Sequence, residues 1–165
     1  MRSKAYPVAL GGMLAAAAVV MMCIGTIIPV ATYAAPVLCM MICQTVLKCC
    51  GSRIAWAWYG AVAVLSLLMA PDKEAAAVFA VLGYYPIVKP KLDRTKAKWL
   101  WKGLLFNGSI LMLYWILLNL LGISQLVEEF SGMGFAMTAV LLVLGNVTFF
   151  LFDRLLTMKL KKRIR

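Results

Sequence analysis

The residues that could do chemistry in this sequence are uncharged polar and aromatic side chains set within apolar stretches. They are Thr26, Thr32, Tyr33, Tyr84, Asn107, Tyr114, Trp115, Asn119, Asn146 and Thr148. The chain contains no histidine, so a His-based acid–base relay or a typical zinc site cannot be built. No glycine-rich phosphate loop and no pair of carboxylates within an apolar stretch is present. We therefore expect neither enzyme activity nor a cofactor, and we expect the polar groups to pair with another helix or with a ligand.

The sulfur-containing residues are a second candidate for chemistry. The five cysteines are Cys23, Cys39, Cys43, Cys49 and Cys50. Cys39 and Cys43 are four residues apart, so on a helix they share a face, and with nearby methionines they could bind Cu(I). Packing of these side chains in an apolar core is the interpretation that we prefer, and we expect no metal site. The cysteines lie in apolar stretches or beside Lys48, which predicts reduced thiols.

Composition places these residues in a membrane. Hydrophobic residues make up 64% of the 165-residue chain, charged residues make up 14%, and the mean hydropathy is +0.93. These values predict an all-α membrane protein with several spans. The net charge of +11 would suggest nucleic acid in a soluble protein, but here the basic residues cluster at the ends of apolar stretches. Anionic lipid head groups attract residues placed in this way, so we expect the lipid bilayer and no nucleic acid as a partner.

Six transmembrane helices in a single domain over residues 1–165 account for the apolar stretches. We expect the spans at about 8–28, 31–47, 54–70, 75–88, 103–122 and 135–152. Gly51 is expected to break the second span from the third, and Asp72 to cap the fourth. The fourth span has only 14 residues, which reach roughly 21 Å of a ~30 Å hydrocarbon core. Neighbouring helices or a cavity must therefore shield it.

The basic residues predict the orientation of the spans. Residues 83–102 read as the one sizeable interior polar loop, with aromatic residues on both sides, as at a cytoplasmic membrane edge. With both termini also in the cytoplasm, 16 of the 17 Lys and Arg lie inside, and Lys73 alone lies outside. The adjacent Asp153 and Arg154 point about 100° apart on a helix, and we interpret them as an anchor at the cytoplasmic end of the last span.

Two groups of residues are candidates for binding. The outer ends of the spans would bring Thr32, Tyr33, Tyr114, Trp115 and Asn119 together with Lys73 around a small-molecule ligand. The first span carries small residues at helical spacing, which let a second helix approach closely. They are Gly11, Gly12, Ala15, Ala16 and Ala18. This small-residue face could pack within the chain or dock a partner subunit.

The span number, the orientation and this small-residue first span resemble the substrate-binding S component of energy-coupling factor (ECF) transporters, or an uncharacterised bacterial membrane protein related to it. The resemblance implies a multi-pass protein of the bacterial plasma membrane that binds a vitamin or another small molecule in an outward-facing pocket. It also implies that the first-span face docks a transmembrane coupling subunit, and that separate ATPase subunits drive uptake. The alternative is an integral membrane scaffold or assembly protein that transports nothing. Only the transporter hypothesis requires a pocket of ligand size.

Overall fold

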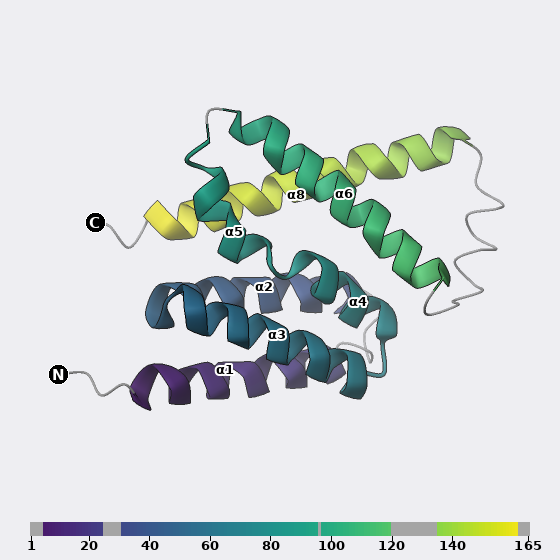
Figure 1. The fold of residues 1–165 in the computed structure, drawn as a ribbon. Coiled ribbons are helices and arrows are strands. Elements are labelled where there is room, and N and C mark those ends of the chain that lie inside the picture. Colours follow the sequence, from purple (N-terminus) through teal and green to yellow (C-terminus); the bar gives the residue numbers. More distant parts are fainter. Residues whose placement is uncertain (1–4, 25–30, 96, 120–134, 162–165) are drawn as a thin grey trace. The chain divides into compact units, whose positions relative to one another are not determined.

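The computed structural model describes residues 5–24, 31–95, 97–119 and 135–161, and every regular element in these ranges is an α-helix (Figure 1). The helices are α1 (Ala5–Ile24), α2 (Ala31–Cys50), α3 (Ser52–Met69), α4 (Lys73–Leu82), α5 (Tyr85–Leu92), α6 (Lys98–Asn119) and α8 (Phe135–Lys161). The all-helical prediction is confirmed. The chain divides into two compact units, residues 1–96 and residues 97–165, and each is described by itself.

Helix α2 is the centre of the first unit, because it packs against α1, α3, α4 and α5. Its buried face carries Cys39 and Cys43, as their four-residue spacing predicts, together with Met40 and Val46. Cys43 is three or four residues from each of the other three, so all four share one face of the helix and the sulfur side chains lie inside the apolar core. The Cys39 thiol donates a hydrogen bond to the backbone carbonyl of Ala18 on α1, at 3.5 Å between Sγ and O.

The turns between α2, α3 and α4 follow from individual residues. Gly51 separates α2 from α3 with a φ of 88°, a conformation that side-chain-bearing residues rarely adopt, so its predicted role as a breaker is confirmed. Asp72 caps α4 as predicted, because its Oδ1 accepts a hydrogen bond from the backbone N–H of Ala75 at 3.0 Å. Glu74 lies in the first turn of α4, where a negative charge is favourable.

The prediction of one continuous helix over 75–88 is wrong. Helix α4 ends at Leu82, the chain turns at Gly83 and Tyr84, and α5 begins at Tyr85. Pro86 favours a helix start here, because it lies in the first turn of α5, where the N–H that proline lacks would have no partner within the helix. The prediction that residues 83–102 form a loop is also wrong. This stretch contains all of α5 and the first turn of α6.

In the described part of the second unit, helices α6 and α8 contact each other. Helix α6 begins at Lys98, five residues before the predicted span at Gly103, and α8 continues to Lys161, nine residues beyond the predicted end at Phe152. Lys102 contacts Asp153, and Asn107, which comes later on α6, contacts Asn146, which comes earlier on α8. The two helices are therefore antiparallel.

Two of the described helices are long and apolar enough to cross a membrane, over Tyr6–Ile24 in α1 and Ser52–Met69 in α3. Helix α2 is apolar over a shorter stretch, Ala34–Cys50. The six-span arrangement and the cytoplasmic placement of both termini go beyond this finding and stay predictions.

Candidate functional site

A row of polar side chains lies between α6 and α8, here called the polar seam. It consists of Lys102 and Asn107 on α6 and Asn146 and Asp153 on α8. Asn146 and Asp153 are seven residues apart, close to two helical turns, so they lie on the same face of α8. Each partner across the seam lies 39 or 51 residues away along the chain.

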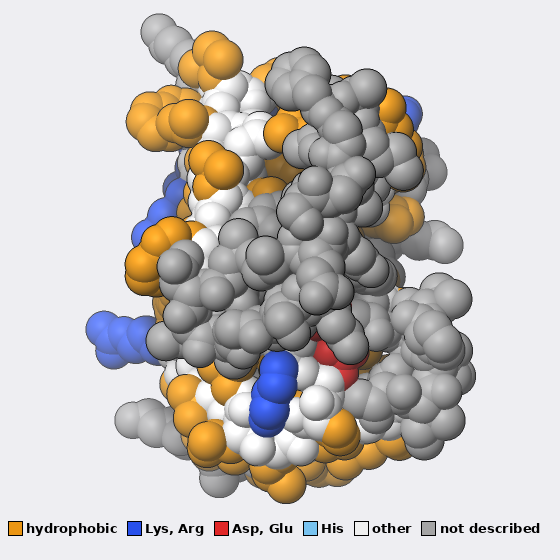
Figure 2. All heavy atoms as spheres, turned by 90° about the vertical axis from the view of Figure 1, so that its right-hand side faces the viewer, with side chains coloured by type: hydrophobic (Ala, Val, Ile, Leu, Met, Phe, Trp, Pro, Cys, Tyr) orange, Lys and Arg blue, Asp and Glu red, His pale blue; other side chains and the backbone are white. Residues whose placement is uncertain are grey.

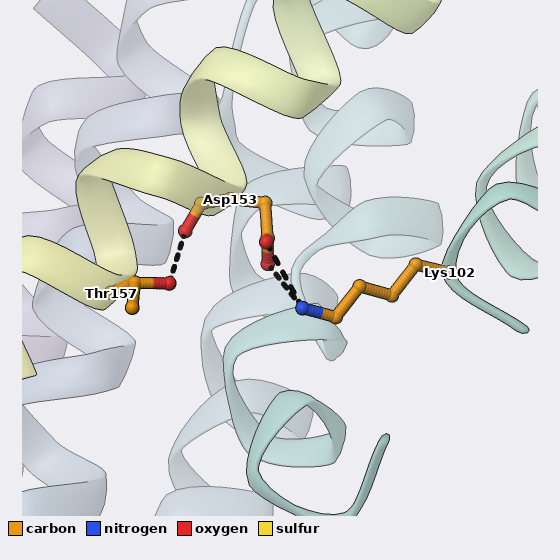
Figure 3. A network of polar contacts seen from close by, with 3 residues as sticks. All are labelled: Lys102, Asp153 and Thr157. Atoms are coloured by element: carbon orange, nitrogen blue, oxygen red, sulfur yellow. Dashed lines mark hydrogen bonds and ion pairs between the residues drawn. The ribbon is translucent and has the colours of Figure 1, made fainter. Parts of the chain in front are cut away.

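The ionic end of the seam is a buried pair (Figure 3). The Lys102 ammonium lies 3.2 Å from Oδ1 and 3.0 Å from Oδ2 of Asp153, and the two side chains are only 6% and 8% exposed. The Thr157 hydroxyl, one turn further along α8, donates a hydrogen bond to the backbone carbonyl of Asp153 at 2.8 Å. Lys102 also lies 5.7 Å from the ring centroid of Trp99. Each charge is thus balanced by its partner in a place that water hardly reaches.

The amide end of the seam is a reciprocal pair. The Asn146 Nδ2 donates to Asn107 Oδ1 at 3.2 Å, and the Asn107 Nδ2 donates to Asn146 Oδ1 at 3.4 Å. Each Nδ2 also donates to the carbonyl four residues earlier in its own helix, Gly103 for Asn107 and Leu142 for Asn146, both at 2.9 Å. The amides therefore satisfy each other between apolar helices, as predicted for polar side chains that pair with a neighbouring helix.

Aromatic stacking packs the two helices around the seam. The rings of Phe106 and Phe149 are stacked with centroids 4.3 Å apart, and those of Trp99 and Phe150 are stacked at 5.3 Å. The seam thus lies inside a packed helix–helix contact and fixes which residues of α6 meet which residues of α8. Chemically, the seam holds a charge pair, in which Lys102 bonds to Asp153, and an amide pair, in which Asn107 bonds to Asn146. Among the described residues, no group of three or more Cys, Asp or Glu is placed to hold a metal ion.

The anchor interpretation of Asp153 needs correction, because Asp153 is buried against Lys102, while the neighbouring Arg154 is exposed. The sequence did not reveal this ion pair, because 51 residues separate the two charges. A carboxylate so close to an apolar span was the available signal, since such a group needs a partner of opposite charge.

The structure describes the side chains of two predicted ligand-binding residues. The Lys73 ammonium donates a hydrogen bond to the carbonyl of Leu67 near the end of α3, at 2.8 Å. Trp115 on α6 is 64% exposed. Thr32 and Tyr33 on α2 and Tyr114 and Asn119 on α6 belong to described helices, but their side chains lie outside the described part of the structure. A pocket that joins these six residues stays a prediction.

The predicted docking face of α1 divides into two rows. Gly11 and Ala18 are buried, and a Cβ added to Gly11 would lie 3.5 Å from Ile54 Cγ2 of α3. Those two residues pack within the chain, which was one of the two interpretations left open. Gly12 and Ala16 are exposed, Ala15 is half-buried, and a Cβ at Gly12 would meet no atom within 4 Å. The row of Gly12 and Ala16 is the part of the face that another helix could reach.

Aromatic residues surround the break between α4 and α5. Tyr59 of α3 donates a hydrogen bond from its hydroxyl to the carbonyl of Ala80, and its ring lies 6.0 Å from Phe79 and 6.5 Å from Tyr84 between centroids. Gly83 is buried where a Cβ would lie 2.4 Å from the carbonyl oxygen of Phe79. The backbone at the break is thus enclosed by side chains of its own unit.

Searches of protein-family models, curated proteins and solved structures found no match to this chain.

Proposed function

We propose that this protein is a multi-pass membrane protein of the bacterial plasma membrane, with six spans and both termini in the cytoplasm. The observation that carries the proposal is the exposed surface of α3, where Val64, Leu68 and Met69 all lie at the surface and Leu68 is 73% exposed. Figure 2 shows hydrophobic side chains at the surface on one face of the molecule. The core helix of a soluble protein is also apolar, but it is mostly buried. In α3, only 22% of the apolar stretch Ser52–Met69 is buried.

The broken fourth span is compatible with a membrane. Helices α4 and α5 together run from Lys73 to Leu92, and the break at Gly83 and Tyr84 falls halfway along them. Non-helical backbone at membrane depth is tolerated where protein surrounds it. Gly83, Tyr85 and Pro86 are buried, which meets this condition. The partition of 16 of 17 Lys and Arg to one side supports the orientation.

Within the membrane, we propose that the protein is the substrate-binding subunit of an uptake system for a vitamin-like or other small molecule, coupled to separate ATPase subunits. The break between α4 and α5 favours this function, because discontinuous helices near the middle of the bilayer form the substrate sites of many transporters. The exposed row of Gly12 and Ala16 would contact a transmembrane coupling subunit. A membrane scaffold is the second candidate, and the 64% exposure of Trp115 favours it, because a ligand-lining residue should be enclosed.

Native mass spectrometry of the gently purified protein separates the two functions. The transporter function predicts a small molecule bound to the protein at one copy per chain. Tyr33→Ala should lose this molecule, and Trp56→Ala, which changes an exposed aromatic residue on α3, should keep it. A protein that carries no small molecule, but that keeps one partner protein in constant ratio, would support the scaffold and contradict the transporter.

A further inference from the structure

The end of the α6–α8 pair at which α6 begins combines exposed basic and exposed apolar residues. Lys98, Trp99, Leu100 and Trp101 lie in the first turn of α6, and all four are exposed, with Leu100 at 77%. The stacking of Trp99 on Phe150 and the Lys102–Asp153 pair hold this turn beside residues 150–157 of α8. Arg154 and Leu155 on that stretch are exposed as well. These six residues are called the basic-aromatic end.

The charges at this end differ in what they can bind. Asp153 neutralises Lys102 inside the helix pair, so Lys102 is not available to an outside partner. Lys98 and Arg154 are exposed, and neither forms an ion pair with a carboxylate among the described residues. Asp153 is the one acidic residue in α6 and α8, so the exposed charge at this end of the unit is positive.

We infer that the basic-aromatic end binds the head groups of anionic phospholipids and selects them over zwitterionic ones. Tryptophan is enriched at the level of the head groups because its ring is apolar and its N–H is polar. Leu100 and Leu155 would reach the acyl chains, while Lys98 and Arg154 meet the phosphates above them. Because the exposed charges at this end are positive, they favour a membrane leaflet that contains anionic lipid. This inference rests on the proposed membrane insertion and adds the lipid class to it.

The test is lipid competition on the full-length protein in detergent, with phosphatidylglycerol and phosphatidylcholine added in equal amounts and the retained lipids counted by native mass spectrometry. The unaltered protein should retain phosphatidylglycerol preferentially. Each basic residue near an anionic surface contributes about fivefold, so Lys98→Gln with Arg154→Gln should lower the preference by roughly 25-fold.

The matched control is Arg53→Gln with Lys91→Gln, which removes two exposed basic residues from the first unit and leaves the basic-aromatic end intact. This control should keep most of the preference. An equal loss in both double variants would mean that the lipids follow net charge, and it would overturn the inference. Absence of any preference in the unaltered protein would overturn it too and would leave an acidic protein partner as the occupant.

Alkaline carbonate extraction of membranes separates failure of this inference from failure of the proposed function. A chain that stays in the membrane pellet but shows no lipid preference refutes the inference alone. A chain that carbonate releases into the supernatant refutes the proposed function as well. Circular dichroism on every variant checks that the helices are retained, and Lys98 and Arg154 are exposed, so neither substitution should unfold them.

Discussion

Removal of one charge from the Lys102–Asp153 pair should destabilise the protein strongly. Asp153→Leu removes the carboxylate that the buried Lys102 ammonium contacts, and burial of a charge is costly when its counter-ion is lost. Breaking a buried pair in this way costs about 3 to 5 kcal/mol of the free energy of unfolding. Lys102→Met should cost a similar amount, because it removes the ammonium that the buried Asp153 carboxylate contacts.

The double variant Lys102→Met with Asp153→Leu removes both charges and keeps an apolar contact of similar volume. Such replacements are often neutral or stabilising, so we expect it to lie within about 1 kcal/mol of the unaltered protein. The two single changes should therefore be far from additive, with a coupling energy of several kcal/mol.

The assay is unfolding of the purified protein in mild detergent, followed by tryptophan fluorescence and by circular dichroism. Lys98→Met is the matched control, since it removes an exposed lysine one turn before Lys102 on α6 and should change stability by less than about 0.5 kcal/mol. The reasoning is refuted if both single variants behave like Lys98→Met, or if their effects simply add.

Three further predictions follow from single contacts, each measured by the same unfolding assay. Gly83→Ala should cost about 1 to 3 kcal/mol, because the new Cβ would lie 2.4 Å from the Phe79 carbonyl oxygen, whereas Gly12→Ala should be tolerated, and equal effects would contradict this account. Tyr59→Phe should cost about 1 kcal/mol by removing the hydrogen bond to the Ala80 carbonyl, and a neutral result would mean that this bond does not form. Asp72→Ala should cost about 1 kcal/mol through loss of the α4 cap, and Asp72→Ser should restore most of it; no loss with alanine would argue against the cap.

Local signals in the sequence were sufficient for much of the first unit. The four-residue spacing of Cys39 and Cys43 placed both in the core, and Gly51 and Asp72 acted as the breaker and the cap that their residue types predict. These features depend on neighbours within a few residues, so a single sequence carries them. The break at Gly83 also had a local signal in Pro86, but the continuous apolar pattern outweighed it.

The polar seam could not be predicted in the same way. Asn107 and Asn146 were recognised as polar residues that need partners, yet nothing local says that they pair with each other across 39 residues. The Lys102–Asp153 contact depends in addition on α6 beginning five residues before the apolar stretch, since only then does Lys102 face α8 as part of a helix. Long-range pairing of this kind follows from helix packing, which hydropathy does not encode.

Cysteine labelling in intact cells tests the central claim, that the chain crosses the membrane with its basic segments in the cytoplasm. Pro71 is exposed in the turn between α3 and α4, on the predicted outer side, and Cys49 is exposed on the predicted inner side. A membrane-impermeant maleimide should label Pro71→Cys in a background that carries serine at positions 23, 49 and 50. It should not label Cys49 of the unaltered protein until the cells are opened. Labelling of Cys49 in intact cells, or of Pro71→Cys only after lysis, would contradict the proposed orientation and the membrane crossing that it requires.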